Sequence, residues 1–392
     1  MARRRRLCML VHGPYPLGEG RVAREALAAL DAGWEVDVVA TRLPGEPAME
    51  QVDGVRVRRL PIAHERGVGA LAVAREYVGF TALAAATVAR AAARSSYDVV
   101  HVHNPPDFLI LAALLPALRG SRVILDIHDL APELFAVRFD GRRGLGLAVD
   151  ALRLIERFAA RAASAVVTVH EPYRRALEER GVPQDKITVV LNSLDERLLP
   201  SAPSAPTENG FRVVYHGTIT PHYGVDQIVE AVALVADEIE EVSLELYGDG
   251  DALGDVEARA AELGIADRVR LSRAYLPQRE VLARIAGAAA GVVSARGLER
   301  NHAAVPTKLF EYARLGIPVV TADLRAIHDY FTPAEVRYYR ADSSEALAEA
   351  LRELAAAPAE ARAMAAAARS RYEEYRWAAS ARRYIELLER LT

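Results

Sequence analysis

Short apolar runs of strand length alternate with longer segments of helical period along this chain, and this alternation restricts its fold more than any other feature. The first series of expected strands comprises residues 7–11, 35–40, 55–60, 99–103, 123–127, 165–169 and 187–191. A helix is expected between the first two strands at Arg21–Ala32, where Gly33 provides a stop signal. Such βα units predict a parallel sheet.

The alternation breaks at Pro200–Gly210, a segment rich in Pro, Ser and Gly that has no periodic apolar face and predicts a linker. A second series of expected strands follows at residues 212–216, 243–247, 269–271, 291–293 and 318–321, with helices at 225–236 and 256–263. We therefore predict an α/β fold of two doubly wound parallel-sheet domains. The length of 392 residues suits two such domains better than one.

The expected domain boundaries follow from this linker. The first domain should cover residues 1–200, the linker 201–210 and the second domain 211–372. The chain ends in Ala-, Arg- and Glu-rich stretches of helical character, and we expect the helix at 373–392 to pack back on the first domain.

The composition excludes several classes of protein. With 51% hydrophobic and 26% charged residues, the chain is neither disordered nor a disulfide-rich miniature fold, and its single cysteine fits a reducing cytoplasm. The first half is mildly basic and the second acidic, a contrast too small to indicate a nucleic-acid partner. The longest uncharged stretch, Tyr77–Ala89, is shorter than the roughly 20 residues that a membrane-spanning helix needs.

Ligands of open α/β sheets bind at the carboxyl ends of the strands, so the loops there are candidate sites. In the first domain, Gly18 and Gly20 precede a helix and would let a ligand approach the backbone closely. The alternative is that these glycines are needed only for the backbone conformation of a turn. His128 lies among carboxylates after the fifth strand, where Asp126 or Asp129 could fix its tautomer for orienting a sugar or acceptor hydroxyl. The alternative is a capping aspartate beside a structural histidine.

Two histidines at the end of the preceding strand raise the question of a metal site. His101 and His103 occupy the same strand face, and polar groups including Asn104 follow them. A third ligand at a convincing spacing is missing from the sequence, so no metal site is predicted.

The second domain has two glycine-containing loops after strands. Gly217 and Thr218, with Tyr223 just before a helix, suit a phosphate near that helix start. The run Gly248–Gly254 superficially resembles a dinucleotide fingerprint, but its third glycine is one place late and two aspartates would repel a pyrophosphate. We interpret that run as a structural turn, which argues against a nicotinamide-dependent oxidoreductase.

The most informative segment is Asn301–Val320. Pro306 suits the start of a helix and Gly316 its end, so Thr307, Lys308 and Leu309 would present amide groups to an anion, with the Lys308 ammonium added. Glu311 lies on the same helical face as Lys308 and can accept hydrogen bonds from a vicinal diol such as a ribose. A surface salt bridge between Lys308 and Glu311 is the simpler alternative.

Three motifs together resemble those of GT-B glycosyltransferases, specifically the retaining family-4-like group (glycosyl transferases group 1) that uses nucleotide-activated sugars. They are the segments 306–320, 216–226 and 125–133, and the resemblance covers nearly the whole chain. It implies two Rossmann-like domains that face each other across a cleft. The acceptor would bind to the first domain and the donor to the second.

The resemblance also implies residue roles. Glu311 would bind the donor ribose, Lys308 and the helix start the diphosphate, and His128 would lie beside the transferred sugar; these three are the expected catalytic residues. The expected donor-binding residues are Gly18, Gly217, Thr218, Tyr223, Arg273, Ala274, Tyr275, Thr307, Lys308, Leu309 and Glu311. The expected acceptor-binding residues are Glu19, Gly20, Arg21, His103, Asn104 and Asp129.

The chain departs from the family pattern at two places. Many members have a second acidic residue eight positions before the ribose-binding glutamate, where this chain has Ala303, so Asn301, His302 or Glu299 would have to replace it. Many members also carry an Arg and a Lys where this chain has Thr218 and Tyr223, which leaves the phosphate charge chiefly to Lys308, with His222 as a possible helper.

The resemblance implies a reaction without a divalent metal or other cofactor, in which the acceptor hydroxyl attacks from the front face and the leaving diphosphate accepts its proton. The acceptor would be a saccharide or a lipid-linked saccharide. The basic amphipathic stretch Arg138–Arg161 is compatible with peripheral contact at the inner face of the membrane, although it could equally pack within its own domain. We expect a cytoplasmic glycosyltransferase of polysaccharide, glycolipid or glycoconjugate biosynthesis.

Two alternative functions share the predicted fold. A nucleotide-sugar 2-epimerase would use carboxylates and histidines without an acceptor. A degenerate nucleotide-sugar-binding subunit would explain Ala303, Thr218 and Tyr223.

Overall fold

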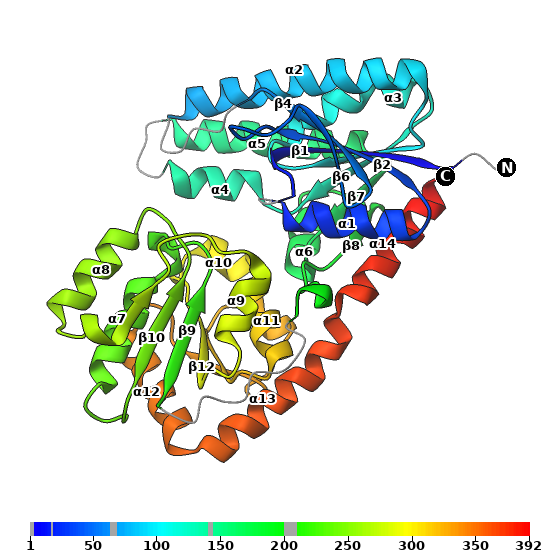
Figure 1. The fold of residues 1–392 in the computed structure, drawn as a ribbon. Helices are drawn as coiled ribbons and strands as arrows, with labels where there is room; N and C mark the ends of the chain where they lie inside the picture. Colours follow the sequence, from blue (N-terminus) through cyan, green and yellow to red (C-terminus); the bar gives the residue numbers. More distant parts are fainter. Residues whose placement is uncertain (1–3, 17–18, 63–68, 140–143, 200–209) are drawn as a thin grey trace. The chain divides into compact units, whose positions relative to one another are not determined.

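The structure, a computed structural model, describes residues 4–16, 19–62, 69–139, 144–199 and 210–392, which form two compact units (Figure 1). Unit 1 comprises Met1–Asn192 together with Ala378–Thr392, and unit 2 comprises Ser193–Trp377. Each unit is built around its own parallel sheet.

Unit 1 contains an eight-stranded sheet in the order β3-β4-β2-β1-β5-β6-β7-β8. Its strands are β1 (Arg6–Pro14), β2 (Glu35–Thr41), β3 (Met49–Val52), β4 (Val55–Leu60), β5 (Val99–His103), β6 (Arg122–Ile127), β7 (Ala165–Thr168) and β8 (Ile187–Val189). All neighbours are parallel except β3 and β4. The central strands are buried on both faces, which explains their continuous apolar runs.

Helices lie on both faces of this sheet, and Figure 1 shows α1 and α2 on opposite sides. The helices of unit 1 are α1 (Gly20–Asp31), α2 (Ala70–Arg94), α3 (Leu114–Leu118), α4 (Ala131–Arg138), α5 (Leu145–Ala162), α6 (Glu171–Glu179) and α14 (Trp377–Leu391), with a 3₁₀ helix η1 (Asp107–Ala113) before α3. The amphipathic stretch expected at 138–161 is thus a helix that begins later, at Leu145 after the left-handed Gly144.

The edge strand β3 was not predicted from the sequence. It pairs antiparallel with β4 through a tight turn at Asp53 and Gly54, which both have positive φ. Asp-Gly is a strong hairpin signal, but Met49–Val52 is largely exposed and lacks the apolar run that marked the other strands. The turn residues, and not hydropathy, carry the information for this strand.

Unit 2 contains a six-stranded parallel sheet in the order β11-β10-β9-β12-β13-β14. Its strands are β9 (Arg212–His216), β10 (Ser243–Tyr247), β11 (Val269–Leu271), β12 (Ala290–Val293), β13 (Val319–Ala322) and β14 (Arg337–Tyr339). Its helices are α7 (Val225–Val235), α8 (Leu253–Glu262), α9 (Gln278–Ile285), α10 (Glu299–Ala303), α11 (Thr307–Leu315), α12 (Ser344–Ala356) and α13 (Pro358–Tyr372). The short edge strand β14 was also missed. Both sheets have the doubly wound order predicted for them.

The division between the units lies at Asn192 and Ser193, earlier than the expected residue 200. The boundary lies earlier because residues just before position 200 contact unit 2. Glu196 accepts hydrogen bonds from Tyr372 (3.1 Å) and Arg376 (3.0 Å) of that unit. The predicted linker lies almost wholly outside the described residues. The final helix α14 belongs to unit 1, where the Tyr384 hydroxyl is 2.9 Å from Nδ1 of His101.

Helix α2 is long and apolar enough to cross a membrane, judged by length and composition only. The uncharged stretch Tyr77–Ala89 considered above lies within this helix and is too short by itself. In the fold only one face of it is buried, where Phe80, Ala84 and Val88 are fully buried, and most of its apolar stretch is not. That face packs against β1 and β4.

Candidate functional site

The strand order of each sheet reverses direction at one point, between β1 and β5 in unit 1 and between β9 and β12 in unit 2. Ligands of open α/β sheets bind beside the carboxyl ends of the strands at such points. The predicted site residues of unit 1 follow β1, β5 and β6, whereas those of unit 2 follow β9 and β11 or begin α11. Each unit therefore has a candidate site at its own switch point.

Lys308 is a buried cation at the start of α11 and is only 7% exposed. Its Nζ lies 3.7 Å from the centre of the Tyr215 ring and 5.3 Å from that of Tyr223. A Cβ at Gly217 would come within 3.4 Å of the same nitrogen. Burial lowers the pKa of Lys308 to about 7, while Glu311 opposes this shift. An anion bound beside Lys308 would restore its charged form.

The helix start around Lys308 is capped as the sequence predicts, with Pro306 before α11 and a left-handed Gly316 after it. One expectation needs correction. The Leu309 amide donates to the carbonyl of Pro306 (3.1 Å), and the Leu309 side chain is fully buried. Thr307 and Lys308 therefore supply the amides at the helix start, and Leu309 serves the core.

Glu311 is held by two neighbours that were not predicted from the sequence. Its Oε2 lies 2.9 Å from Nε2 of His216, and its Oε1 accepts a hydrogen bond from Nε2 of Gln278 (2.8 Å). His216 ends β9 and Gln278 begins α9, so three elements fix this carboxylate. Glu311 is 3% exposed, which excludes the surface salt bridge with Lys308 considered above.

The remaining residues predicted to bind the donor lie on two loops that meet. The Tyr275 hydroxyl donates to the carbonyl of Asp249 (2.9 Å) and is 3.5 Å from Oγ1 of Thr218. Arg273 has a left-handed backbone and pairs with Glu257 (2.8 Å), and the Ala274 carbonyl accepts a hydrogen bond from Ser272 (2.9 Å). The loops after β9 and β11 are therefore brought together by the loop after β10.

The glycines after β10 are required by close backbone contact. A Cβ at Gly248 would overlap the carbonyl of Gly217, and one at Gly250 would overlap the carbonyl of Ile219. The amide of Gly217 donates to Tyr247 (2.9 Å) and that of Ile219 to Asp249 (3.0 Å). These contacts account for the glycine run as a structural turn beside the Lys308 site.

We expect Gly248→Ala to lower the stability of unit 2 by about 1–3 kcal/mol, because the added methyl group must displace the Gly217 backbone. Thermal unfolding would measure this effect. Gly254→Ala is the matched control, since a Cβ there meets nothing within 4 Å and lies in the first turn of α8. Equal effects of the two substitutions would contradict this account.

The three candidates to replace the missing acidic residue all have structural partners. Asn301 is buried, and its amide donates to the carbonyls of His222 (3.0 Å) and Arg296 (2.8 Å). Glu299 pairs with Arg325, and Nδ1 of His302 accepts a hydrogen bond from the Arg325 amide (3.3 Å). Asn301 therefore fixes the loop that carries His222 through its side-chain nitrogen.

In unit 1, Glu19, His128 and Asp129 line one pocket of about 560 Å³, as the sequence grouped them. Burial lowers the pKa of His128, so its ring is neutral at pH 7. Burial, with the nearby Asp129 and Asp126, raises the pKa of Glu19 to about 8. Gly20 is exposed at the first position of α1, and Gly18 lies outside the described residues.

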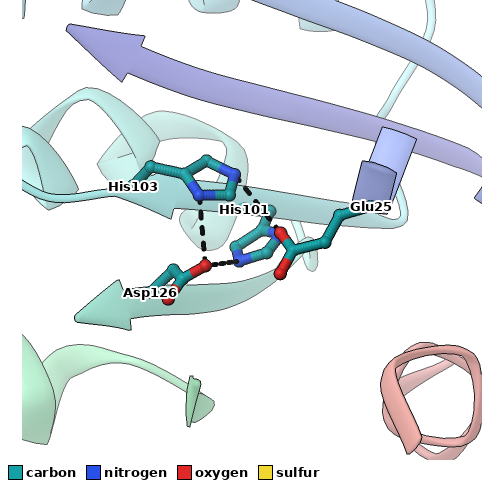
Figure 2. Close-up of side chains that lie close together, drawn as sticks. All are labelled: Glu25, His101, His103 and Asp126. Carbon is teal, nitrogen blue, oxygen red and sulfur yellow. Dashed lines mark ion pairs between the residues drawn. The ribbon is translucent and has the colours of Figure 1, made fainter. Parts of the chain in front are cut away.

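Arg21 and His103 were predicted to contact the acceptor, and the structure corrects this. His103 is fully buried and Arg21 nearly so. The Arg21 guanidinium donates to Asp126 (2.8 Å) and pairs with Glu25 (3.1 Å), while Nδ1 of His103 is 3.2 Å from Asp126 (Figure 2). Both therefore act as positioning residues behind the pocket.

Asn104 is a further correction. Its amide nitrogen donates to Asp107 (2.9 Å) and to the Asp129 carbonyl (2.7 Å). Its oxygen accepts hydrogen bonds from the amides of His128 (3.0 Å) and Asp129 (3.2 Å). Asn104 is buried, so it fixes the loop of His128 and does not bind a ligand.

The buried network in Figure 2 has the donor set of a metal site, because one ligand atom from each of Glu25, His101, His103 and Asp126 lies within 4.8 Å of the others. Glu25 and Asp126 lie far from the two histidines in sequence, which is why the histidines seemed to lack further ligands. The Arg21 guanidinium already contacts both carboxyl groups and balances the charge of Asp126, while burial raises the pKa of Glu25 to about 8. We therefore assign the network to support of the β5 and β6 strand ends.

Two segments of the chain match known sequence families. Residues 18–193 match the family described as "Glycosyl transferase 4-like domain", and residues 201–371 match "Glycosyl transferases group 1". A 2-deoxystreptamine glucosyltransferase from Streptomyces kanamyceticus is 31% identical over 138 residues. That match covers 32% of this chain and 35% of the relative, so it spans about a third of the relative's length.

Solved structures share the fold along almost the whole chain. Sucrose-phosphate synthase from Thermosynechococcus elongatus is 19% identical, with a TM-score of 0.80 over 99% of each chain. HepE from Anabaena, solved in complex with UDP-glucose, is 14% identical, with a TM-score of 0.72 over 98% of this chain and 99% of that one. These identities establish the fold alone, which confirms the predicted GT-B architecture. The chain therefore belongs to the GT-B glycosyltransferases and joins a glycosyl transferase 4-like domain to a domain of the glycosyl transferases group 1 family.

Proposed function

We propose that this protein transfers a sugar from a nucleoside-diphosphate sugar to an acceptor hydroxyl in the cytoplasm, with retention and without a metal or cofactor. The observation that carries the proposal is the buried Lys308 at the start of α11, beside the tightly held Glu311. A diphosphate would pair with the Lys308 ammonium and a ribose diol with the Glu311 carboxylate. HepE, a structural neighbour, was solved with UDP-glucose, which supports a donor of this class.

In the proposed reaction, the acceptor oxygen forms a bond to the anomeric carbon as the bond from that carbon to the diphosphate breaks. The proton of the hydroxyl passes to the leaving phosphate oxygen. Lys308 and the amides at the α11 start would stabilise the negative charge that develops there, which is the largest contribution a protein can make to such a step. His128, neutral in its pocket, would orient the sugar or the acceptor hydroxyl.

The function is tested by incubating the whole chain with UDP-, GDP- and ADP-sugars, with and without candidate acceptors. Acceptor-dependent release of nucleotide supports transfer. Release of a free epimer would instead identify a nucleotide-sugar epimerase, and binding without turnover a degenerate subunit. Either of these outcomes would overturn the proposal.

Glu311→Gln should raise the dissociation constant of the donor about 10- to 100-fold, because a charged acceptor of two ribose hydrogen bonds is lost while the packing is kept. Isothermal titration with the sugar nucleotide that the panel selects would measure this change. Glu349→Gln, at an exposed position on α12, is the matched control and should leave the affinity unchanged. Unchanged affinity in Glu311→Gln would remove the ribose assignment.

We also propose that unit 1 contacts an anionic membrane surface. Helices α2, α3 and α5 each contact the η1 segment, and α2 also contacts α3. Their exposed apolar residues are Leu71, Val78, Leu83, Leu114, Leu115, Leu118, Leu147, Leu154 and Phe158. Exposed arginines on α5 accompany them, which suits an anionic lipid surface. The protein should float with vesicles that contain anionic lipid and not with neutral vesicles, and failure to float with either would contradict this contact.

A further inference from the structure

A second pocket of unit 1 lies apart from the candidate sites and combines cationic with apolar side chains. We call it the arginine pocket after three of its lining residues, Arg58, Arg90 and Arg94. Its volume is about 560 Å³, typical of small-molecule sites, and it lies between the edge strands and α2, on the face of the sheet opposite α1 (Figure 1). Its residues Arg6 and Arg56 lie at the amino ends of β1 and β4, whereas the pocket around His128 lies beyond the carboxyl ends of strands.

The register of the edge strands explains the floor of the arginine pocket. Residues that pair directly across neighbouring strands lie on the same face of a sheet. Arg58 of β4 pairs in this way with Val39 of β2 and with Met49 of β3, so the three side chains lie side by side. Met49 is 64% exposed, which brings the apolar part of the floor to solvent.

Helix α2 supplies the facing wall. Its lining residues include Thr87, Arg90, Ala91 and Arg94, whose spacing of three, four and seven residues places them on one helical face. Arg94 lies in the last turn, where a cation complements the negative end of the helix. Arg90 lies one turn earlier, so this effect does not account for it.

The three arginines that name the pocket have no counter-charge in the described part of the chain. Arg58, Arg90 and Arg94 are exposed, and none of them forms a hydrogen bond or an ion pair with another described residue. A guanidinium group keeps its charge at every ordinary pH. The pocket therefore holds three positive charges that a bound anion would neutralise.

The two acidic residues of the lining do not balance these charges, because they already have cations of their own. Asp37 accepts a hydrogen bond from Arg6 (3.1 Å) and pairs with Arg56. Glu50 accepts a hydrogen bond from Arg59 (2.7 Å).

We propose that the arginine pocket binds a phosphate monoester that carries an apolar group. The phosphate would lie among Arg58, Arg90 and Arg94, and the apolar group over Val39 and Met49. A phosphate monoester accepts several hydrogen bonds and carries nearly two negative charges at pH 7, so three guanidinium groups suit it better than they suit a carboxylate. This inference does not rest on the proposed transferase function.

The phosphate has two possible sources, a soluble ester and the headgroup of an anionic lipid. Arg90 follows Leu83, an exposed residue of the proposed membrane contact, by about two helical turns. A lipid phosphate is therefore within reach of the pocket, and the experiments must separate it from a soluble ester.

Three matched probes test both parts of the proposed ligand on the whole chain. 1-Naphthyl phosphate has an aromatic group and a phosphate, 1-naphthol keeps only the aromatic group, and inorganic phosphate keeps only the anion. Isothermal titration at pH 7.5 should show 1-naphthyl phosphate binding at least about tenfold more tightly than either of the others. Equal binding of 1-naphthol or of inorganic phosphate would overturn the proposal.

Substitutions on the floor and on the wall assign this binding to the arginine pocket. Arg58→Gln and Arg90→Gln should each weaken 1-naphthyl phosphate at least about fivefold and leave 1-naphthol unchanged, because each removes one charge from the pocket. Arg75→Gln is the matched control, since Arg75 is an exposed arginine of the same helix outside the pocket lining, and it should leave the affinity unchanged.

Lys308→Met separates the arginine pocket from the proposed diphosphate site of unit 2 and should also leave 1-naphthyl phosphate binding unchanged. Thermal unfolding would show that each variant is folded. Undiminished binding in folded Arg58→Gln and Arg90→Gln, or loss of binding in Lys308→Met, would overturn the proposal.

Vesicle flotation identifies the source of the phosphate. If the ligand is a lipid headgroup, a variant with both Arg58→Gln and Arg90→Gln should float less with vesicles that contain phosphatidic acid, and free 1-naphthyl phosphate should release the wild type from them. If the ligand is a soluble ester, neither change should affect flotation while the titrations still show the site. Each of these results supports a phosphate monoester site and assigns its source.

Discussion

Replacing Lys308 with methionine should weaken binding of the proposed nucleoside-diphosphate-sugar donor about 100-fold, because the methionine keeps the apolar part of the side chain and removes the charge that would pair with the diphosphate. The substitution should not lower stability. Lys308 is buried over the Tyr215 ring and its pKa is lowered to about 7, so the folded protein already disfavours its charged form. Isothermal titration and thermal unfolding would measure the two quantities on the same sample. Lys186→Met, at the only other lysine of the chain, should change neither donor affinity nor its pH dependence.

The same lysine predicts how donor affinity depends on pH. In the free protein about half of the Lys308 side chains are neutral at pH 7, whereas bound diphosphate favours the ammonium. The dissociation constant of the proposed donor should therefore be nearly flat below pH 7 and rise by close to tenfold per pH unit between pH 7.5 and 8.5. Lys308→Met should lose this dependence. A wild-type affinity that stays constant up to pH 8.5 would contradict the lowered pKa of Lys308, whereas an unchanged affinity in Lys308→Met would show that Lys308 does not bind the diphosphate.

The parts of the fold that could be predicted are those determined by residues close together in the sequence. β5, β9 and β10 have the predicted bounds, because most residues of each are apolar or aromatic and the central ones are buried in a parallel sheet. The α11 boundaries follow from Pro306 and Gly316, whose backbone preferences act within one turn. β3 and β14 were missed because an edge strand buries little and so needs no apolar run.

The candidate sites divide in the same way. Lys308 and Glu311 were identified because helix geometry places residues three apart on one face. His216 and Gln278 were missed as partners of Glu311, since they come from other elements and their contacts depend on the folded sheet. Arg21 and His103 were assigned to the acceptor for the same reason, because neither the distant Asp126 nor Glu25 could be placed beside them from sequence. Their burial, which decides their role, is a tertiary property.

The second large effect is expected at Asp126, which joins Arg21 and His103 at the end of β6. Although its burial acts in the opposite direction, Arg21 and the hydrogen bond with His103 hold the pKa of Asp126 well below its ordinary value, so it is charged at every ordinary pH. Asp126→Asn would leave the Arg21 guanidinium buried without its main counter-charge. We expect unit 1 to lose about 3–5 kcal/mol of stability. Hydrogen exchange should show faster exchange in β5 and β6 and unchanged exchange in β9 and β10.

Glu25→Gln is the control that separates loss of charge from loss of a side chain in the same network. Burial raises the pKa of Glu25 to about 8, so at pH 7 its carboxyl group is mostly protonated and glutamine is close to an isosteric, equally neutral replacement. Its cost should therefore stay within about 1 kcal/mol. In Asp126→Asn, Glu25 becomes the remaining anion beside Arg21 and its pKa should fall, so the double variant should cost more than the two single costs added together. Equal costs for the two single variants at pH 7 would contradict this charge assignment, because it would mean that both carboxyl groups are ionised beside Arg21.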